Sequence, residues 1–436
     1  MLYNIVRPVA RIWLKACFRK IHLHQAELIP TDKPVILAAN HPTAFIEPCI
    51  LATNLPMPLN FIVRGDLFAK PFYTKLLKSL NMVPIFRLKD GGYKKLKNNY
   101  DTFTFCYEAL RDQKTIMILA EGTTRHEKRL RPLRKGTARI VFGALESQGE
   151  LDIHIVPVGV NYTYADQLRK EAMIEFGKPI RVLDYWEEYK QEPNQATRKL
   201  LEELRKRLEK RVIIIDNPTD DSLVEQLFVV YRNDRPQRVW PLVVRNNDRL
   251  MGEKRIANWI NKLQEVEKER VVEKVQTYYR ALEKHQVADL GVAQSWQANW
   301  RNTLILVLGF FPFLLGLIGN YLPYSIANGI VRKKVRAVEF KLSVWLAAGM
   351  VLYLLYWLVL LLLGLMIEQP IYWAFWAMLP FWGFFAFLYA ELLAKWRQAK
   401  QFRSLAAAVQ SELRQKRAGL SSLIDGQMNK KTTSEV

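Results

Sequence analysis

The amino-acid sequence predicts an α/β domain with a largely parallel sheet flanked by helices, followed by a charged helical region and C-terminal transmembrane helices. Three observations support this prediction. Short apolar runs alternate with longer amphipathic segments as far as about residue 185, which is typical of parallel strands joined by helices. Segments of mixed charge then continue to residue 300, and three long apolar blocks follow. With 436 residues, the chain is long enough for more than one domain.

Residues 1–30 are predicted to form an amphipathic, membrane-associated N-terminal helix. The basic residues of this segment recur every four positions, and apolar residues fill the other side: Arg7, Arg11, Lys15 and Arg19. Such a helix can lie in the headgroup region of a bilayer. The alternative is a terminal helix that packs on its own domain. The segment lacks an uninterrupted apolar stretch and a small-residue cleavage site, so it does not resemble a secretory signal.

Residues 31–185 contain the alternating pattern of the α/β domain. The predicted strands are 35–40, 60–65, 115–122, 153–162 and 173–180, with helices near 44–53, 71–80, 93–111 and 134–147. In sheets of this kind the chemistry is found beyond the carboxyl ends of the strands. The region that follows, 186–300, is rich in charges of both signs at helical spacing, which is typical of solvated helix faces.

Residues 301–400 are predicted to form a membrane domain. Its three apolar blocks are 303–327, 342–367 and 371–394, and each is long enough to cross a hydrocarbon core of about 30 Å. The second and third blocks are separated by the short sequence EQP, which predicts a hairpin. The first block is interrupted by prolines, glycines and an asparagine, which favours a re-entrant or kinked segment.

The basic residues around these blocks predict the orientation of the chain. The segments 331–341 and 395–403 are strongly basic, so both should face the cytoplasm. A re-entrant first block then keeps the α/β domain on the cytoplasmic face of an integral membrane protein, whereas a full crossing would place it outside. Residues 401–436 are expected to be a cytoplasmic tail that is disordered after about Gly419.

The formal net charge of +22 predicts an anionic partner, which could be a nucleic acid, an anionic membrane or a phosphorylated substrate. No nucleic-acid-binding motif accompanies this charge, and the aromatic residues near the C-terminus fit membrane segments, so nucleic acid is not expected. The cysteines Cys17, Cys49 and Cys106 lack metal-ligand spacing and suggest neither a disulfide framework nor a zinc site.

Four short stretches occur at or just beyond predicted strands. They are NHPTAFIEP (40–48), FIVRGDLF with VPIFRLKDG (61–68 and 83–91), LAEGTTRHEKRLRPLRKG (119–136) and IVPVGVNY (155–162). In this order they resemble the four motifs of the glycerolipid acyltransferase family, and they are most similar to its fungal-type glycerol-3-phosphate acyltransferase branch. The resemblance covers roughly residues 5–185. It implies an acyltransferase domain and transfer of an acyl group from a thioester to an alcohol.

His41 and Glu47 are the candidate catalytic residues. A neutral imidazole is a suitable base for removing the proton of an attacking hydroxyl near neutral pH. A carboxylate on the other ring nitrogen would fix the tautomer and stabilise the imidazolium. The usual motif has four residues between the His and an Asp, whereas this chain has five and a Glu. The pairing of His41 with Glu47 is therefore implied by the resemblance alone.

The resemblance also implies a phosphate site and an acyl pocket. Guanidinium groups and backbone N–H groups suit a glycerol phosphate dianion. The residues implied to hold it are Arg87, Glu121, Gly122, Thr123, Arg125 and Lys135. Arg125 is displaced by one position from the usual arginine of the third motif. Pro157, in the fourth motif, is expected to shape the acyl pocket, although a proline at a strand end is an equally good interpretation.

The sequence therefore predicts a membrane-bound O-acyltransferase that acylates glycerol 3-phosphate in phospholipid biosynthesis, with His41 as general base. The donor would be acyl-CoA or acyl-carrier protein, the other partner would be membrane lipid, and no metal or cofactor is expected. Lysophosphatidate is the alternative acceptor. A second alternative is a catalytically inactive, lipid-binding membrane scaffold, which the altered first motif would favour.

Overall fold

The computed structural model describes residues 2–86, 99–293, 298–367 and 369–429, and it consists of two compact units. The first, here called the α/β unit, comprises Met1–Val212, Trp240–Asn247 and Arg336–Ser343. The second, here called the helical unit, comprises Ile213–Val239, Asp248–Val335 and Val344–Val436. The α/β unit thus extends past residue 185 and includes two later segments of the chain.

The α/β unit is built on one largely parallel sheet, which confirms the predicted fold class. Its order is β4-β3-β5-β2-β6-β7-β1-β9, and β8 pairs with β6. All neighbouring strands in the described residues pair in parallel, except that β6 is antiparallel to β7 and β8. The strands are β1 Lys20–His24, β2 Val35–Ala39, β3 Leu59–Arg64, β4 Met82–Ile85, β5 Thr115–Leu119, β6 His154–Tyr162, β7 Glu171–Phe176, β8 Ile180–Arg181 and β9 Val243–Val244.

The five predicted strands correspond to β2, β3, β5, β6 and β7, whereas β4 and β9 were missed, as was β1. Its sequence, KIHLH, is predominantly polar, yet Lys20 and His22 are almost fully buried. The Lys20 ammonium donates a 2.6 Å hydrogen bond to the carbonyl of Pro241, and His22 Nδ1 lies 3.0 Å from Asn246 Oδ1. Both partners belong to the segment Trp240–Asn247. These long-range contacts allow polar residues to occupy a buried strand, and the local sequence does not reveal them.

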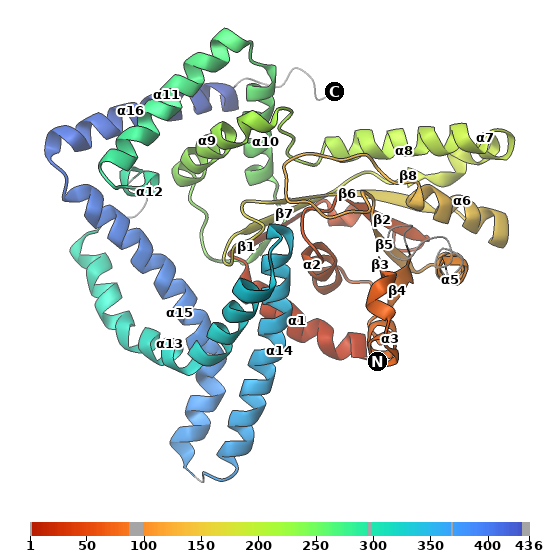
Figure 1. Ribbon diagram of the computed structural model, residues 1–436, viewed down its shortest axis with the longest axis horizontal. Helices are drawn as coiled ribbons and strands as arrows, with labels where there is room; N and C mark the ends of the chain where they lie inside the picture. The colour runs from red at the N-terminus through yellow and green to blue at the C-terminus, as the bar shows by residue number, and fades with distance from the viewer. Residues whose placement is uncertain (1, 87–98, 294–297, 368, 430–436) are drawn as a thin grey trace. The chain divides into compact units, whose positions relative to one another are not determined.

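Helices cover both faces of this sheet (Figure 1). On one side lie α6 and α8, and on the other α1 and α2. The helices of the unit are α1 Leu2–Cys17, α2 Ile46–Asn54, α3 Pro71–Ser79, α5 Asn99–Arg111, α6 Gly136–Gln148, α7 Trp186–Gln191 and α8 Pro193–Glu209, with 3₁₀ turns η1 Ala26–Leu28, η2 Gly65–Phe68 and η4 Val182–Tyr185. Because all residues of β2 are buried, the core lies around this central strand.

Helix α1 is attached to its own domain through basic side chains. The guanidinium groups of Arg7 and Arg11 donate to the carbonyls of Leu55 and Thr53, at the end of α2. Carbonyls at the end of a helix lack partners within that helix, so these contacts satisfy them. Apolar side chains of α1 nevertheless remain exposed, among them Ile12 at 72%. Packing on the domain therefore leaves an apolar surface for the membrane association that the sequence predicts.

The helical unit contains a bundle of helices beside the membrane helices. They are α9 Asp221–Asp234, α10 Asp248–Lys262, α11 Glu265–Lys284, α12 Asp289–Val292 and α16 Ala407–Asn429, with η5 Pro218–Asp220. Helix α16 corrects the expectation of a disordered tail after Gly419. Leu413, Leu420 and Ile424 recur on one side of this helix and are buried. Polar residues between them obscure this pattern in the sequence.

An ionic cluster fixes α16 within the bundle. Arg417 Nε lies 2.9 Å from Asp289 Oδ1, and its Nη1 lies 2.6 Å from Asp234 Oδ1. The hydroxyl of Tyr278 donates to the same Asp289 oxygen over 2.6 Å. Both Arg417 and Asp289 are buried, so each charge depends on the other for compensation.

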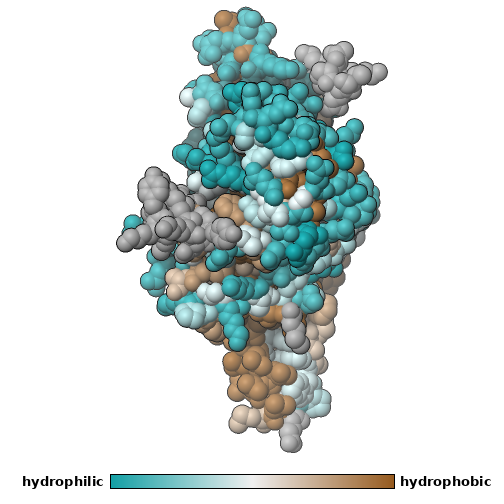
Figure 2. Space-filling model, turned by 90° about the vertical axis from the view of Figure 1, so that its right-hand side faces the viewer, coloured by the Kyte–Doolittle hydropathy of each residue, from teal (hydrophilic) through white to brown (hydrophobic). Residues whose placement is uncertain are grey.

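Three helices of the described residues are long and apolar enough to cross a membrane: α13 Trp300–Lys334, α14 Val338–Gly364 and α15 Pro370–Arg403. Figure 2 shows hydrophobic residues gathered at the end of the molecule formed by α14 and α15. The predicted block 303–327 lies within α13, which is continuous and has Pro312 and Pro323 in its interior.

We predict that Arg417→Met destabilises the helical unit by about 3 kcal/mol, because it leaves Asp289 buried without its charge partner. Thermal unfolding of the detergent-solubilised protein measures this loss. Lys416→Met, which removes an exposed ion pair with Glu412 on the same helix, is the control and should cost less than about 1 kcal/mol. Equal effects of the two substitutions would contradict the prediction.

Candidate active site

The carboxyl ends of β2 and β5 lie side by side and bring two of the sequence motifs together. Ala39 pairs with Leu119 at the ends of these strands, and the N–H of Ala120 donates to the Ala39 carbonyl over 2.8 Å. His41 and Glu121 therefore begin loops at the same rim of the sheet. The rim is the position where parallel sheets carry their chemistry.

Asn40 joins this rim to the neighbouring strand β6. Its side-chain amide donates to the Val160 carbonyl over 2.9 Å and accepts from the Val160 N–H over 2.7 Å. These two hydrogen bonds continue the pairing of β2 with β6 beyond the end of β2. They fix the point where the loop that carries His41 leaves the sheet. The sequence analysis did not single out Asn40, although it directly precedes the candidate base.

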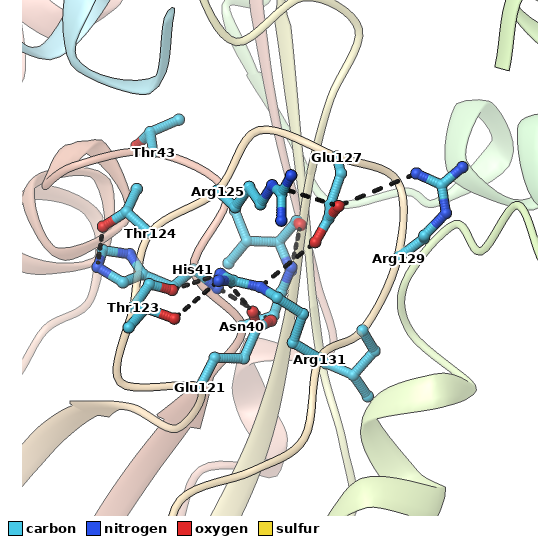
Figure 3. A network of polar contacts seen from close by, with 12 residues as sticks. Asn40, His41, Thr43, Glu121, Thr123, Thr124, Arg125, Glu127, Arg129 and Arg131 are labelled. Carbon is cyan, nitrogen blue, oxygen red and sulfur yellow. Dashed lines mark hydrogen bonds and ion pairs between the residues drawn. The ribbon is translucent and has the colours of Figure 1, made fainter. Parts of the chain in front are cut away.

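His41 is buried, with 9% of its surface exposed, and its ring points toward the third motif (Figure 3). Its Nε2 lies 2.6 Å from the hydroxyl of Thr124. The backbone N–H of His41 donates to Glu121 Oε1 over 3.4 Å, and its carbonyl accepts from the N–H of Arg125 over 3.3 Å. The first and third motifs thus hold each other through side-chain and backbone contacts.

Glu47 lies in the first turn of α2 and is fully buried. Its Oε1 accepts from the backbone N–H of Thr43 over 2.6 Å, and its Oε2 lies 2.9 Å from the Thr43 hydroxyl. Burial raises the pKa of Glu47 to about 8, although hydrogen bonds from Thr43 act in the opposite direction. Glu47 therefore anchors the loop that follows His41. That it also orients the imidazole stays a prediction.

Glu121 forms a buried ion pair with Arg131, which the sequence analysis did not select. Glu121 Oε2 lies 2.8 Å from Arg131 Nη2. The same guanidinium donates to the Thr123 hydroxyl over 2.7 Å and to the Thr123 carbonyl, and its Nε lies 3.4 Å from Glu127 Oε1. Burial raises the pKa of Glu121, while Arg131 lowers it. In the sequence, Arg131 is one of several basic residues, and nothing local distinguishes it.

Gly122 allows the sharp turn between Glu121 and Thr123. Its φ of +66° lies in the left-handed region, and a Cβ atom there would lie 2.9 Å from Arg134 Cγ. Both the backbone conformation and the close approach of Arg134 therefore favour glycine.

The remaining candidates lie in different settings. Arg125 has an exposed side chain, with Nε 3.8 Å from Glu127 Oε2. Lys135 is exposed directly before α6. Pro157 is buried within β6, in register with Ala38, and Arg87 lies outside the described residues. Their binding roles stay predictions. Among the described residues, no three His, Cys, Asp or Glu side chains form a group suited to a metal ion.

Residues 20–161 match the family model described as Acyltransferase. Two curated yeast proteins are similar to the chain. Glycerol-3-phosphate O-acyltransferase 2 of Saccharomyces cerevisiae is 28% identical over 35% of this chain and 21% of its own length. Glycerol-3-phosphate O-acyltransferase 1 of the same yeast is 24% identical over 63% of this chain and 36% of its own length. The chain thus spans 21% of the length of the first relative and 36% of the length of the second.

Among solved structures, the 1-acyl-sn-glycerophosphate (LPA) acyltransferase PlsC from Thermotoga maritima aligns with a TM-score of 0.32 at 17% identity, over 46% of this chain and 82% of that chain. The family model covers β1 to β5 and all of β6 except Tyr162, and it includes His41, Glu47 and the loop from Glu121 to Arg131. Residues 20–161 thus form an acyltransferase domain, and the chain is similar to the yeast glycerol-3-phosphate O-acyltransferases.

Proposed function

We propose that this protein is a membrane-bound O-acyltransferase that transfers a fatty acyl group from an acyl thioester to a hydroxyl of glycerol 3-phosphate. The observation that supports it most directly is the position of His41, which is buried at the rim with Nε2 2.6 Å from a hydroxyl oxygen. The two yeast relatives are glycerol-3-phosphate O-acyltransferases, which supports the same acceptor. The α/β unit works at the cytoplasmic face of the membrane in this proposal.

The hydroxyl of Thr124 indicates where the substrate hydroxyl would bind. A substrate hydroxyl in its place would put its proton within reach of Nε2, which then acts as the general base. As the proton leaves, the hydroxyl oxygen attacks the thioester carbonyl and an ester bond forms. The carbon–sulfur bond breaks, and the imidazolium returns the proton to the departing thiolate. No acyl-enzyme is needed.

Two carboxyl groups support this arrangement in different ways. Glu47 is protonated near neutral pH because its pKa is raised to about 8, and it holds Thr43 in the loop beside His41. Glu121 accepts from the His41 backbone and is paired with Arg131. The two groups thus fix the backbone on which the imidazole depends, which is the preorganisation that catalysis requires.

The acceptor phosphate would bind among cations of the third motif. Arg125 is exposed beside the His41 loop, and Lys135 is exposed before α6, so both are available to an anion. Arg87 is the third cation of this proposal. Either acyl-CoA or acyl-carrier protein would serve as donor, with no metal or cofactor. Lysophosphatidate remains the alternative acceptor, and an inactive lipid-binding scaffold is the alternative from another class.

The first experiment measures acyl transfer by the purified, detergent-solubilised full chain. A labelled acyl-CoA or acyl-carrier protein is offered with glycerol 3-phosphate and, separately, with lysophosphatidate. We expect product with glycerol 3-phosphate and a loss of at least about 100-fold in kcat for His41→Ala, because general-base catalysis contributes that much or more.

The matched control is His126→Ala, which removes an exposed histidine from the same loop as Arg125 and should retain activity. Turnover that survives His41→Ala would rule out the proposed base. Product with lysophosphatidate alone would change the acceptor, and no product from any pair would favour the scaffold.

Arg131→Met should lower kcat by roughly 10-fold or more, because it leaves Glu121 buried without its cation and releases Thr123. Arg129→Met is the matched control, since Arg129 lies at the longer distance of 4.0 Å from Glu127. Steady-state kinetics of the two variants test this role. If both variants behave alike, the Glu121–Arg131 pair does not position the active site.

Glu47 should make stability depend on pH. A carboxyl whose pKa rises from 4.5 to about 8 on folding binds its proton more tightly in the native state. Its stabilising contribution is complete below about pH 4.5 and is lost as the pH rises through about 8. Melting temperatures of the wild type should therefore fall more between about pH 5 and 9 than those of Glu47→Gln. If the melting temperatures of the wild type and Glu47→Gln change with pH in the same way, the raised pKa of Glu47 is contradicted. Glu150→Gln, at an exposed position, is the control for the loss of a carboxyl group as such.

A further inference from the structure

Helix α13 first runs along α15 in the opposite direction. Near its start, the Thr303 hydroxyl accepts a 3.0 Å hydrogen bond from Trp396 Nε1, and the Leu306 carbonyl accepts one of 2.9 Å from the Tyr389 hydroxyl. Further on, a Cβ atom added to Gly316 would lie 2.1 Å from the backbone oxygen of Trp382. Later residues of α13 therefore contact earlier residues of α15, so the two helices run antiparallel along this stretch.

The antiparallel run of α13 along α15 ends at Asn320. Its side-chain amide donates to the Leu379 carbonyl over 3.3 Å and to the Gly316 carbonyl over 3.0 Å. The carbonyl of Asn320 accepts from the Tyr353 hydroxyl of α14 over 3.3 Å. Asn320 is itself buried, so this polar side chain is held where all three helices meet.

Beyond Asn320 the contacts reverse. The ring of Tyr324 lies 6.4 Å from that of Phe387 and 5.8 Å from that of Trp345. Phe387 is about 12 Å closer than Leu379 to the carboxyl end of α15, at about 1.5 Å per residue. Helix α13 therefore turns back toward the end of α15 where it began, and it is drawn as an arch in Figure 1.

The sequence of α13 explains this bend. Pro323 has no N–H group and its ring displaces the carbonyl four residues earlier, which kinks a helix. Gly316 and Gly319 allow α15 to approach closely, since a Cβ atom on Gly319 would lie 2.6 Å from Leu379 Cδ1. The amide of Asn320 supplies polar contacts at the bend.

The carboxyl end of the arch continues directly into the α/β unit. The segment Arg336–Ser343, which contains the start of α14, belongs to that unit. There the N–H of Ala44, three residues after His41, donates to the Glu339 carbonyl over 3.2 Å. Between residues 213 and 293, the structure describes no helix that could cross a membrane. A full crossing by α13 would place Glu339 and Ala44 on opposite sides of the bilayer.

We propose that α13 is a re-entrant arch that enters and leaves the membrane on the same side, and that α14 and α15 cross the bilayer. The partner of this surface is the acyl-chain region of the bilayer. Basic residues at both ends of the arch suit lipid phosphates: Arg301, Arg332, Lys333 and Lys334. Large apolar side chains are exposed between these ends, including Val307, Leu308, Phe311, Ile318 and Tyr321.

The depth of the arch agrees with this arrangement. Leu379, at the bend, lies about 25 Å along α15 from Trp396. It remains about 12 Å from Ile371, near the other end of the helix. On α14, Tyr353 contacts the bend at about 22 Å from Val338. Because a hydrocarbon core is about 30 Å thick, the arch enters deeply without emerging.

The inference is tested by the sidedness of single cysteines in sealed vesicles of known orientation. Arg301→Cys, Lys334→Cys and Met366→Cys are treated with a membrane-impermeant maleimide. We expect positions 301 and 334 to react from the same side and position 366, which is 82% exposed near the α14–α15 turn, from the other. Reaction of positions 301 and 334 from opposite sides would overturn the proposal.

Unmodified protein supplies the background, since Cys17 and Cys106 are buried and Cys49 is half-buried. Maleimide labelling after the vesicles are dissolved in detergent measures the total amount of reactive cysteine in each variant. A nitroxide on Tyr321→Cys then reports depth, and it should be accessible to oxygen but not to a water-soluble nickel chelate. Access to the chelate would show that the arch lies at the surface. None of these measurements depends on acyl transfer. A negative result for the arch would therefore leave the proposed function standing, and a negative result for acyl transfer would leave the arch standing.

Discussion

The parallel pairing of β2 between β5 and β6 is the constraint on which the rest of the α/β unit depends. It places Ala39 opposite both Leu119 and Val158, so β2 and β5 end together beside β6, which continues to Tyr162. A shift of one residue in this register would send every side chain to the other face. Because the loops carrying His41 and Glu121 leave from these ends, the geometry of the active site is determined by buried strands that take no part in the chemistry.

Sequence patterns predicted the strands that alternate cleanly with amphipathic helices, and they predicted the position of His41 at a strand end. They failed where the stabilising partners are distant. The buried strand of Lys20 and His22 depends on carbonyl and amide groups more than 200 residues later, and no local rule contains that information. Helix α16 was missed for a related reason, because its burial depends on Arg417 reaching acidic residues of two other helices.

The candidate site was also only partly predictable from the sequence. Motif resemblance made His41, Glu121 and Gly122 candidates, because they match the motifs that the sequence resembles. It could not identify Arg131, because several basic residues surround it and only the fold determines which one meets Glu121. The contacts of both Glu47 oxygens with Thr43 were likewise not predictable, and its role toward the imidazole stays a prediction. Residue type was predictable, but pairing depended on three-dimensional structure.

The contacts of Asn40 limit which residues can precede His41, the proposed general base. The Val160 peptide presents one donor and one acceptor to Asn40, so the matching side chain needs an acceptor and a donor side by side. Aspartate would place a second acceptor against a carbonyl, and glutamine would have to accommodate an extra methylene in a buried position. Serine is too short to span both groups. The position should therefore tolerate fewer substitutions than its lack of a chemical role suggests.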